Sequence, residues 1–270
     1  MTKPQSSMEI FKLLPKTNCK ECRAPSCLAF SVLVFKGEKQ LDECPYIEKE
    51  IVERLDGKIK TRMTAEQDYA VKLEQMKKQI STLDLDSSAH KLGGSFPGYK
   101  LTLKILGKDF SIDSKAAISS DIHIHQWVAI PFLSYIIKNA GVPVSGKWVP
   151  FRELPGGKDW YRLFGQRCEK PLKEVADTYT DLFEDLIHIF NGKQVENHYE
   201  SDISLVLHPL PKVPILICYW RPDDGLESDL NLFFDSTAED NLNIESIYAL
   251  ATGLVVMFEK IALRHGAVNI

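Results

Sequence analysis

Apolar residues recur at helical spacing in two charged stretches of the first ninety residues. They fall three or four positions apart within 46–60 and again within 65–83. One face of an α-helix repeats about every 3.6 residues, so this pattern predicts two amphipathic helices. The next run, SSAHKLGGSFPG at 87–98, breaks the pattern with Ser, Gly and Pro, and we expect a domain boundary there.

Beyond residue 98, strand-like and helix-like segments follow one another. Residues 99–113 alternate apolar and polar on either side of Gly107-Lys108, which predicts a β-hairpin. Two more strands are predicted within 204–222, around a proline-rich turn, and a third within 230–237. Three segments predict helices: 123–141, which Gly141 would end and Pro131 would kink or divide; 172–192, one long helix that Gly192 would end; and 244–263, a mostly buried helix.

This order of elements predicts the fold class. Strands followed by helices, without a repeated strand–helix–strand unit, are typical of an α+β domain with a largely antiparallel sheet. We predict a small helical module in residues 1–60, a helical linker in 61–90, and a larger α+β domain of antiparallel strands and packed helices in 91–270. A domain of that size can bury its own core.

Composition narrows the class of protein. The chain has 270 residues, 44% of them hydrophobic and 26% charged, which is ordinary for a soluble globular protein. A net charge of −4 gives no bulk attraction to nucleic acid. The N-terminus lacks the apolar segment of a secretory signal, and no apolar run is long enough to predict a membrane span. We therefore expect no membrane partner. We expect a cytoplasmic protein, in which clustered cysteines more often bind metal than form disulfides.

Four of the six cysteines lie close together near the N-terminus. Cys19, Cys22, Cys27 and Cys44 are spaced C-x2-C-x4-C-x16-C-P. Ser26 is placed to cap a helix whose first turn contains Cys27, and Gly37 is placed to end it. Backbone N–H groups at such a helix start would face a negatively charged centre.

Two kinds of centre suit these ligands. A four-thiolate zinc site usually combines two C-x2-C pairs, and only the first pair is present here. Cubane iron–sulfur clusters commonly use a C-x2-C segment with a remote Cys-Pro. The ligand chemistry therefore favours one iron–sulfur cluster, with zinc as the alternative.

The run LPKTNCKECRAPSCLAF…LDECP resembles the N-terminal 4Fe-4S module of the corrinoid iron–sulfur protein's large subunit. The resemblance implies that Cys19, Cys22, Cys27 and Cys44 bind one 4Fe-4S cluster. The rest of the chain resembles an uncharacterised domain family that occurs behind such modules in anaerobes, on the residues FRELPGG, LPKVPI and LNLFFDST. The resemblance implies electron transfer in anaerobic one-carbon or corrinoid-linked metabolism.

A corrinoid site is not evident in the sequence. The loop D-x-H-x-x-G is absent, and its nearest relative runs from Asp121 to Gln126, with Gln in place of Gly. We therefore expect a separate redox partner protein, such as a corrinoid protein or a methyltransferase. Direct corrinoid binding is the rival interpretation, with the aromatic-rich stretch from Trp148 to Phe164 lining the pocket.

Other candidate residues define the alternatives. His123 and His125 could pair on a metal, but two histidines at a helix start are more often structural. Cys168, between Arg167 and Lys170, is expected to be exposed with a lowered pKa, but a free thiol without a role is favoured over a nucleophile because no nearby His supplies a base. Cys218 is expected to be a buried hydrophobe, and His188 to lie near a buried face.

No acid–base or nucleophile constellation stands out in the sequence. An electron-transfer or accessory protein is therefore favoured over a stand-alone enzyme. The alternatives are a zinc-stapled interaction module and a redox enzyme with its pocket in the C-terminal domain.

Overall fold

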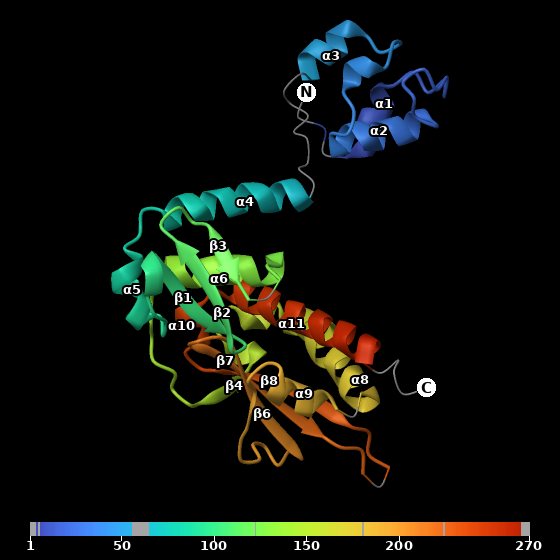
Figure 1. Cartoon of the computed structure of the whole chain (residues 1–270). Coiled ribbons are helices and arrows are strands. Elements are labelled where there is room, and N and C mark those ends of the chain that lie inside the picture. Colours follow the sequence, from blue (N-terminus) through green and yellow to red (C-terminus); the bar gives the residue numbers. More distant parts are fainter. Residues whose placement is uncertain are drawn as a thin grey trace. The chain divides into compact units, whose positions relative to one another are not determined.

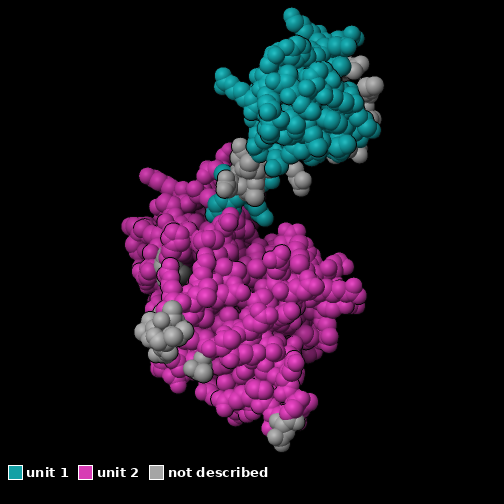
Figure 2. Space-filling model, turned by 90° about the vertical axis from the view of Figure 1, so that its right-hand side faces the viewer, with its two compact units in different colours: residues 1–72 teal, residues 73–270 magenta. Residues whose placement is uncertain are grey.

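The computed structural model describes residues 4, 6–55, 65–121, 123–179, 181–223 and 225–265. The chain divides into two units, Met1–Lys72 and Leu73–Ile270 (Figure 2). The first contains helices, and the second contains two antiparallel sheets with helices packed on them (Figure 1). The predicted α+β class is confirmed.

The N-terminal unit is built around α2. This helix, Cys27–Lys36, begins at the N-cap Ser26, whose Oγ accepts a hydrogen bond from the Ala29 N–H at 3.1 Å. It ends at Gly37 in the left-handed conformation, with φ 77°. Both predicted helix ends are confirmed. The other elements are α1 (Ser7–Leu13), a 3-10 turn (Leu41–Glu43) and α3 (Lys49–Leu55), which bury Ile10, Leu14, Phe30, Val34, Leu41 and Leu55 together.

The second predicted amphipathic helix is α4, Ala65–Ile80, and a further helix follows it. This helix, α5 (Leu85–Lys91), begins at Asp84, whose Oδ1 accepts a hydrogen bond from the Ser87 N–H at 3.2 Å. The first residues of the break predicted over 87–98 are therefore helical, because Asp84 caps a helix that begins just before them. Ile80, at the end of α4, is fully buried in the core of the larger unit.

The smaller sheet has the order β1-β2-β3 and is antiparallel. Its strands are β1 (Lys100–Ile105), β2 (Lys108–Asp113) and β3 (Ile118–Ser120). The turn between β1 and β2 has positive φ at both Leu106 (50°) and Gly107 (77°). Two such residues match the twist of a tight hairpin, so the predicted hairpin is confirmed.

The larger sheet has the order β4-β8-β7-β6-β5, also antiparallel. The strands predicted from 204–222 and 230–237 are present. Strand β7 is buried along almost its whole length, because the main core covers one face and a smaller cluster, with Val206, Leu216 and Phe233, covers the other. The bounds are β4 (Trp148–Pro150), β5 (Lys193–Gln194), β6 (Ile203–Leu210), β7 (Val213–Trp220) and β8 (Asp229–Asp235).

Helices cover this sheet, and α6 lies beside α11 (Figure 1). Gly253 permits their close approach, because a Cβ there would lie 2.3 Å from the Trp127 ring. The bounds are α6 (Gln126–Lys138), α7 (Tyr161–Phe164), a π-helical turn (Gly165–Glu169), α8 (Lys170–Thr178), α9 (Leu182–His188), α10 (Ala238–Asn241), α11 (Ile244–His265) and 3-10 turns at Pro97–Tyr99, Phe151–Glu153 and Gly157–Asp159.

Two helix predictions need correction. The predicted single helix over 172–192 is wrong, since α8 and α9 are separated at Tyr179, whose backbone is extended and whose hydroxyl donates to Asp185 Oδ2 at 2.6 Å. Gly192 therefore ends neither helix. Helix α6 ends at left-handed Asn139, ahead of Gly141, and Pro131 lies within α6 without dividing it.

Helix α11 has an unusual composition for a surface helix. Over Ile244–Arg264 it is long and apolar enough, by those two criteria alone, to cross a membrane. However, 44% of its most apolar window is buried inside the unit, where α11 packs against α6 and α8. Core packing accounts for its apolar character.

Candidate iron–sulfur cluster site

The four N-terminal cysteines come from three segments. Cys19 and Cys22 lie in the loop between α1 and α2, Cys27 is the first residue of α2, and Cys44 follows the 3-10 turn. Cys19 is exposed and the other three are buried. Burial is the main cause that raises the pKa of the Cys44 thiol, and the other three cysteines raise it further. The four thiols therefore lie close enough to interact electrostatically.

The loop that carries the first two cysteines has a strained backbone. Lys16, Asn18, Lys20 and Arg23 have φ values of 60°, 51°, 66° and 58°. Each non-glycine residue in this left-handed region costs about 1–2 kcal/mol. Left-handed residues in a loop turn successive N–H groups toward one side, as in backbone nests that bind anions and iron–sulfur clusters. Such a concentration of strain is typical of a ligand-binding loop.

Asn18 holds Cys27 at two points. Its side-chain Oδ1 accepts a hydrogen bond from the Cys27 N–H at 2.7 Å, and its own N–H donates to Cys27 Sγ at 3.3 Å. The Tyr46 N–H likewise donates to the sulfur of Cys44. Backbone N–H groups that donate to sulfur stabilise negative charge there and are one means of tuning a cluster's potential. Sequence reasoning assigned Asn18 no role, because its left-handed conformation is not visible in the spacing.

A side-chain contact joins the two cysteine loops. The Tyr46 hydroxyl donates to Glu21 Oε1 at 2.6 Å, so the residue beside Cys22 is tied to the segment after Cys44. This hydrogen bond is the main reason why the pKa of Tyr46 is raised. Nothing in the sequence pattern pairs residues 25 positions apart, so sequence reasoning missed this contact.

The residues present suit an iron–sulfur centre. Four thiols form a soft donor set, and soft thiolates suit both iron–sulfur clusters and zinc. Lys16, Lys20 and Arg23 place three cations on the same loop against one carboxylate, Glu21, so the loop has a net positive charge. Within the described ranges, no three His, Cys, Asp or Glu side chains are arranged to hold a single metal ion. The four cysteines are thus near one another without forming a single-ion geometry.

The two histidines are positioned by a helix start. His125 is the N-cap of α6, and its Nδ1 accepts a hydrogen bond from the Trp127 N–H at 3.5 Å. Both His123 and His125 are exposed, with ring centroids 6.3 Å apart. The structural interpretation therefore fits them. Ile122, within the segment compared with the corrinoid loop, lies outside the described residues.

The expectation for Cys168 is wrong. The π-helical turn directs it inward, where it is fully buried 3.4 Å from Thr252 Oγ1. Burial raises its pKa to about 12, which is opposite to the predicted direction. Cys218 is fully buried, as expected, whereas His188 is exposed and does not lie on a buried face.

Residues of the aromatic stretch 148–164 line a small pocket. Its volume is about 280 Å³, and Phe151, Tyr161 and Phe164 contribute to its wall. Ligand pockets usually have about 300 Å³ or more. Phe151 and Phe164 are themselves buried and stack with centroids 4.1 Å apart. These rings mainly fill the core.

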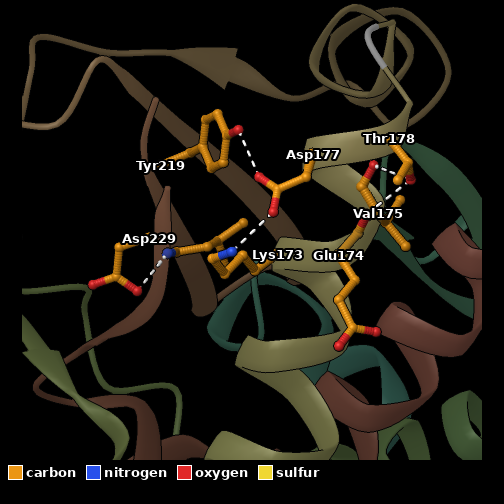
Figure 3. Close-up of polar contacts among 8 residues, drawn as sticks. Lys173, Glu174, Val175, Asp177, Thr178, Tyr219 and Asp229 are labelled. Atoms are coloured by element: carbon orange, nitrogen blue, oxygen red, sulfur yellow. Dashed lines mark hydrogen bonds and ion pairs between the residues drawn. The ribbon is translucent and has the colours of Figure 1, made fainter. Parts of the chain in front are cut away.

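A polar network in the larger unit is internally satisfied. Asp177 of α8 accepts hydrogen bonds from the Tyr219 hydroxyl at 2.8 Å and from Lys173 Nζ at 2.9 Å (Figure 3). Burial by itself would raise the pKa of Asp177, but hydrogen bonds from Ser228, Lys173 and Tyr219 give a net lowering. The network joins α8 to β7 and has the character of a structural contact.

Two family models match the chain. The model described as "Putative Fe-S cluster" covers residues 14–46, which contain all four clustered cysteines. The model described as "Domain of unknown function (DUF3786)" covers residues 84–257, more than half of the chain. The predicted resemblance of both regions is confirmed.

Curated relatives match the N-terminal region. The acetyl-CoA decarbonylase/synthase complex subunit gamma of Methanocaldococcus jannaschii is 46% identical over 59 residues, which are 22% of this chain and 12% of the relative. The corrinoid/iron-sulfur protein large subunit of Moorella thermoacetica is 47% identical over 54 residues, 20% of this chain and 12% of the relative. This chain therefore spans only about an eighth of these relatives. No solved structure gives a significant match.

Proposed function

This chain belongs to the family described as Domain of unknown function (DUF3786), and we propose that it transfers single electrons through one 4Fe-4S cluster in its N-terminal unit. One observation carries the proposal. Four thiols are gathered beside a strained, cation-bearing loop within the segment that matches an iron–sulfur family. When bound, such a cluster supplies reversible one-electron chemistry.

We assign the cluster to four thiolates. Cys19, Cys22, Cys27 and Cys44 would each bind one iron. Asn18 fixes the position of Cys27 through both of its hydrogen bonds. The buried side chains of α1 and α2 exclude water from one side of the site, while Cys19 remains near solvent. An exposed ligand on one side suits electron exchange with a partner.

The proposed setting is anaerobic one-carbon metabolism in the cytoplasm. The matched relatives are named as subunits of multi-protein systems, which supports a protein partner for this chain. We propose a redox partner such as a corrinoid protein or a methyltransferase. The larger unit, with more than half of the chain, would dock that partner.

Metal content tests the assignment. Anaerobically purified protein should contain about four irons and four sulfides per chain and absorb broadly near 400 nm. Cys19→Ala/Cys22→Ala should lose this iron, whereas the matched control Cys168→Ala/Cys218→Ala should keep it, because those thiols lie buried in the other unit. Iron retained in the first variant, or a colourless zinc protein, would contradict the proposal.

Electron transfer is tested separately. The reduced protein should pass electrons to a partner recovered by anaerobic pull-down, and Cys27→Ala should abolish the transfer while docking persists. A Cys27→Ala protein that supports the partner's turnover as well as wild type would show that the cluster is structural.

A further inference from the structure

A basic pocket lies in the larger unit. Its volume is about 470 Å³, and it opens where the β1–β2 turn, the loop from α9 to β5, and β6 come together. This volume lies within the usual range for small-molecule sites. Its polar lining includes Lys104, Lys108, His188, Asn191, Lys193 and His208.

The charges in this pocket have one sign. Three lysines carry the positive charge, two histidines also line the pocket, and no Asp or Glu does. Lys104 Nζ pairs with Asp109 at 2.7 Å, just outside the lining. Among the residues that the structure describes, Lys108 and Lys193 have no ion-pair partner. A concave cationic surface on a chain of net charge −4 attracts anions locally.

The wall of the pocket is held in place before any ligand binds. The Leu106 N–H donates to the His208 carbonyl oxygen at 2.9 Å, which ties the hairpin turn to β6. Gly107 lies against Asn191, and a Cβ at Gly107 would come within 2.6 Å of the Asn191 Cβ. Leu106 and Asn191 are both left-handed, at φ 50° and 54°. A pre-formed wall reduces the ordering that ligand binding requires.

His208 adds a polar group deeper in the pocket. It is partly buried on β6, and burial, followed by the charge of Lys193, lowers its pKa. Its imidazole is therefore neutral near pH 7 and able to donate one hydrogen bond. The lysines are exposed, so the pocket combines exposed positive charges with a partly buried imidazole.

We infer that this pocket binds a small phosphorylated ligand, of the phosphomonoester or pyrophosphate class. Lysine ammonium groups act on phosphate as point charges. No arginine lines the pocket, so recognition of the anion rests on the lysine charges. The lining also lacks an aromatic ring other than the histidines, so nothing there stacks nucleobases of a single strand.

Binding of pyrophosphate to the full chain tests the inference. At about 0.15 M salt, calorimetry should show saturable binding, tighter than that of citrate. Lys108→Gln/Lys193→Gln should weaken it by about 100-fold, roughly tenfold for each charge-assisted contact removed. The matched control Lys115→Gln/Lys158→Gln removes two exposed lysines outside the pocket and should leave the affinity unchanged.

Several outcomes would overturn the inference. These are no pyrophosphate binding by wild type, equal weakening by the control variant, or citrate binding as tight as pyrophosphate. An oligonucleotide that binds while pyrophosphate does not would identify a nucleic-acid surface instead. The inference is independent of the cluster, so Cys19→Ala/Cys22→Ala should bind pyrophosphate as wild type does.

Discussion

The two units place their cysteines in opposite environments. In the N-terminal unit, four thiols lie near one another beside a backbone with four left-handed non-glycine residues. In the larger unit, Cys168 and Cys218 are each fully buried, and burial raises both pKa values. The comparison teaches that cysteine count alone says little, because it is the gathering of four thiols that distinguishes the N-terminal cysteines from those of the core.

Within the larger unit, polar groups are satisfied to different degrees. Asp235 of β8 is fully buried and accepts hydrogen bonds from Ser145, Gly146 and Thr237. Such a carboxylate has a structural role. In contrast, Lys108 and Lys193 carry charges with no ion-pair partner within the described part of the chain. Groups left unsatisfied in a stable unit are the better guide to binding.

The largest expected effect concerns where the larger unit begins. Met76, Ile80 and Leu85 are buried in its core, although they precede residue 91. Fragment 73–270 should therefore unfold cooperatively and exceed fragment 91–270 in free energy of unfolding by about 5 kcal/mol, because each large apolar side chain contributes about 1.5–3 kcal/mol. Urea denaturation measures the difference. Equal stability of the two fragments would place the boundary near residue 91.

A smaller effect is expected at Asp235. Asp235→Asn should destabilise the larger unit by about 2 kcal/mol at pH 7, since an amide cannot accept from every donor that faces it. The folded pKa of Asp235 is lowered by donors that outweigh its burial. Its contribution is therefore present above its unfolded pKa of about 3.9 and is lost as pH falls through the lower folded value.

Thermal melts from pH 7 to pH 2 check this prediction. The stability difference between wild type and Asp235→Asn should shrink only below about pH 4. Asp159→Asn, at an exposed position, serves as the control and should change stability little at any pH. A difference that shrinks already near pH 6 would rule out a lowered Asp235 pKa as the cause.

Local signals explain most of what the sequence predicted. Ser26 and Gly37 delimit α2 by capping, and the alternation around Gly107 forms a hairpin, both from signals in neighbouring residues. The failures involve tertiary contacts. Tyr179 separates α8 from α9 through Asp185, and a π-helical turn directs Cys168 inward. Neither effect has a signature in hydrophobic periodicity.

The same distinction applies to the two sites. The cysteine set is readable because its four members have a characteristic spacing within 26 positions. The basic pocket draws its residues from 93–108, 188–193 and 208–211, three segments that only the fold brings together. No single segment is basic enough to predict it.

Asn18 offers a test within the N-terminal unit. Asn18→Gly keeps the left-handed backbone but removes the acceptor for the Cys27 N–H, and should lower the stability of this unit by about 1 kcal/mol. Asn18→Ala should cost about 1 kcal/mol more, because alanine disfavours positive φ. Denaturation followed by loss of absorbance near 400 nm measures the order, and equal losses for Gly and Ala would contradict the strain argument.

The smallest expected effect is the absence of reaction at two thiols. Under native conditions at pH 8, Cys168 and Cys218 should resist an alkylating reagent, whether or not the N-terminal unit carries iron. Burial raises the pKa of Cys168 to about 12, so its thiolate fraction is roughly a thousandfold below that of a free cysteine. Its side chain is also fully buried, so a reagent in solution does not reach it.

The exposed Cys19 serves as the comparison and should react first once iron is removed. All six cysteines should react in denaturant, and peptide mass mapping assigns each site. Native labelling of Cys168 at the rate of Cys19 would show that the larger unit opens locally, and the contrast between the two sets of cysteines would then be lost.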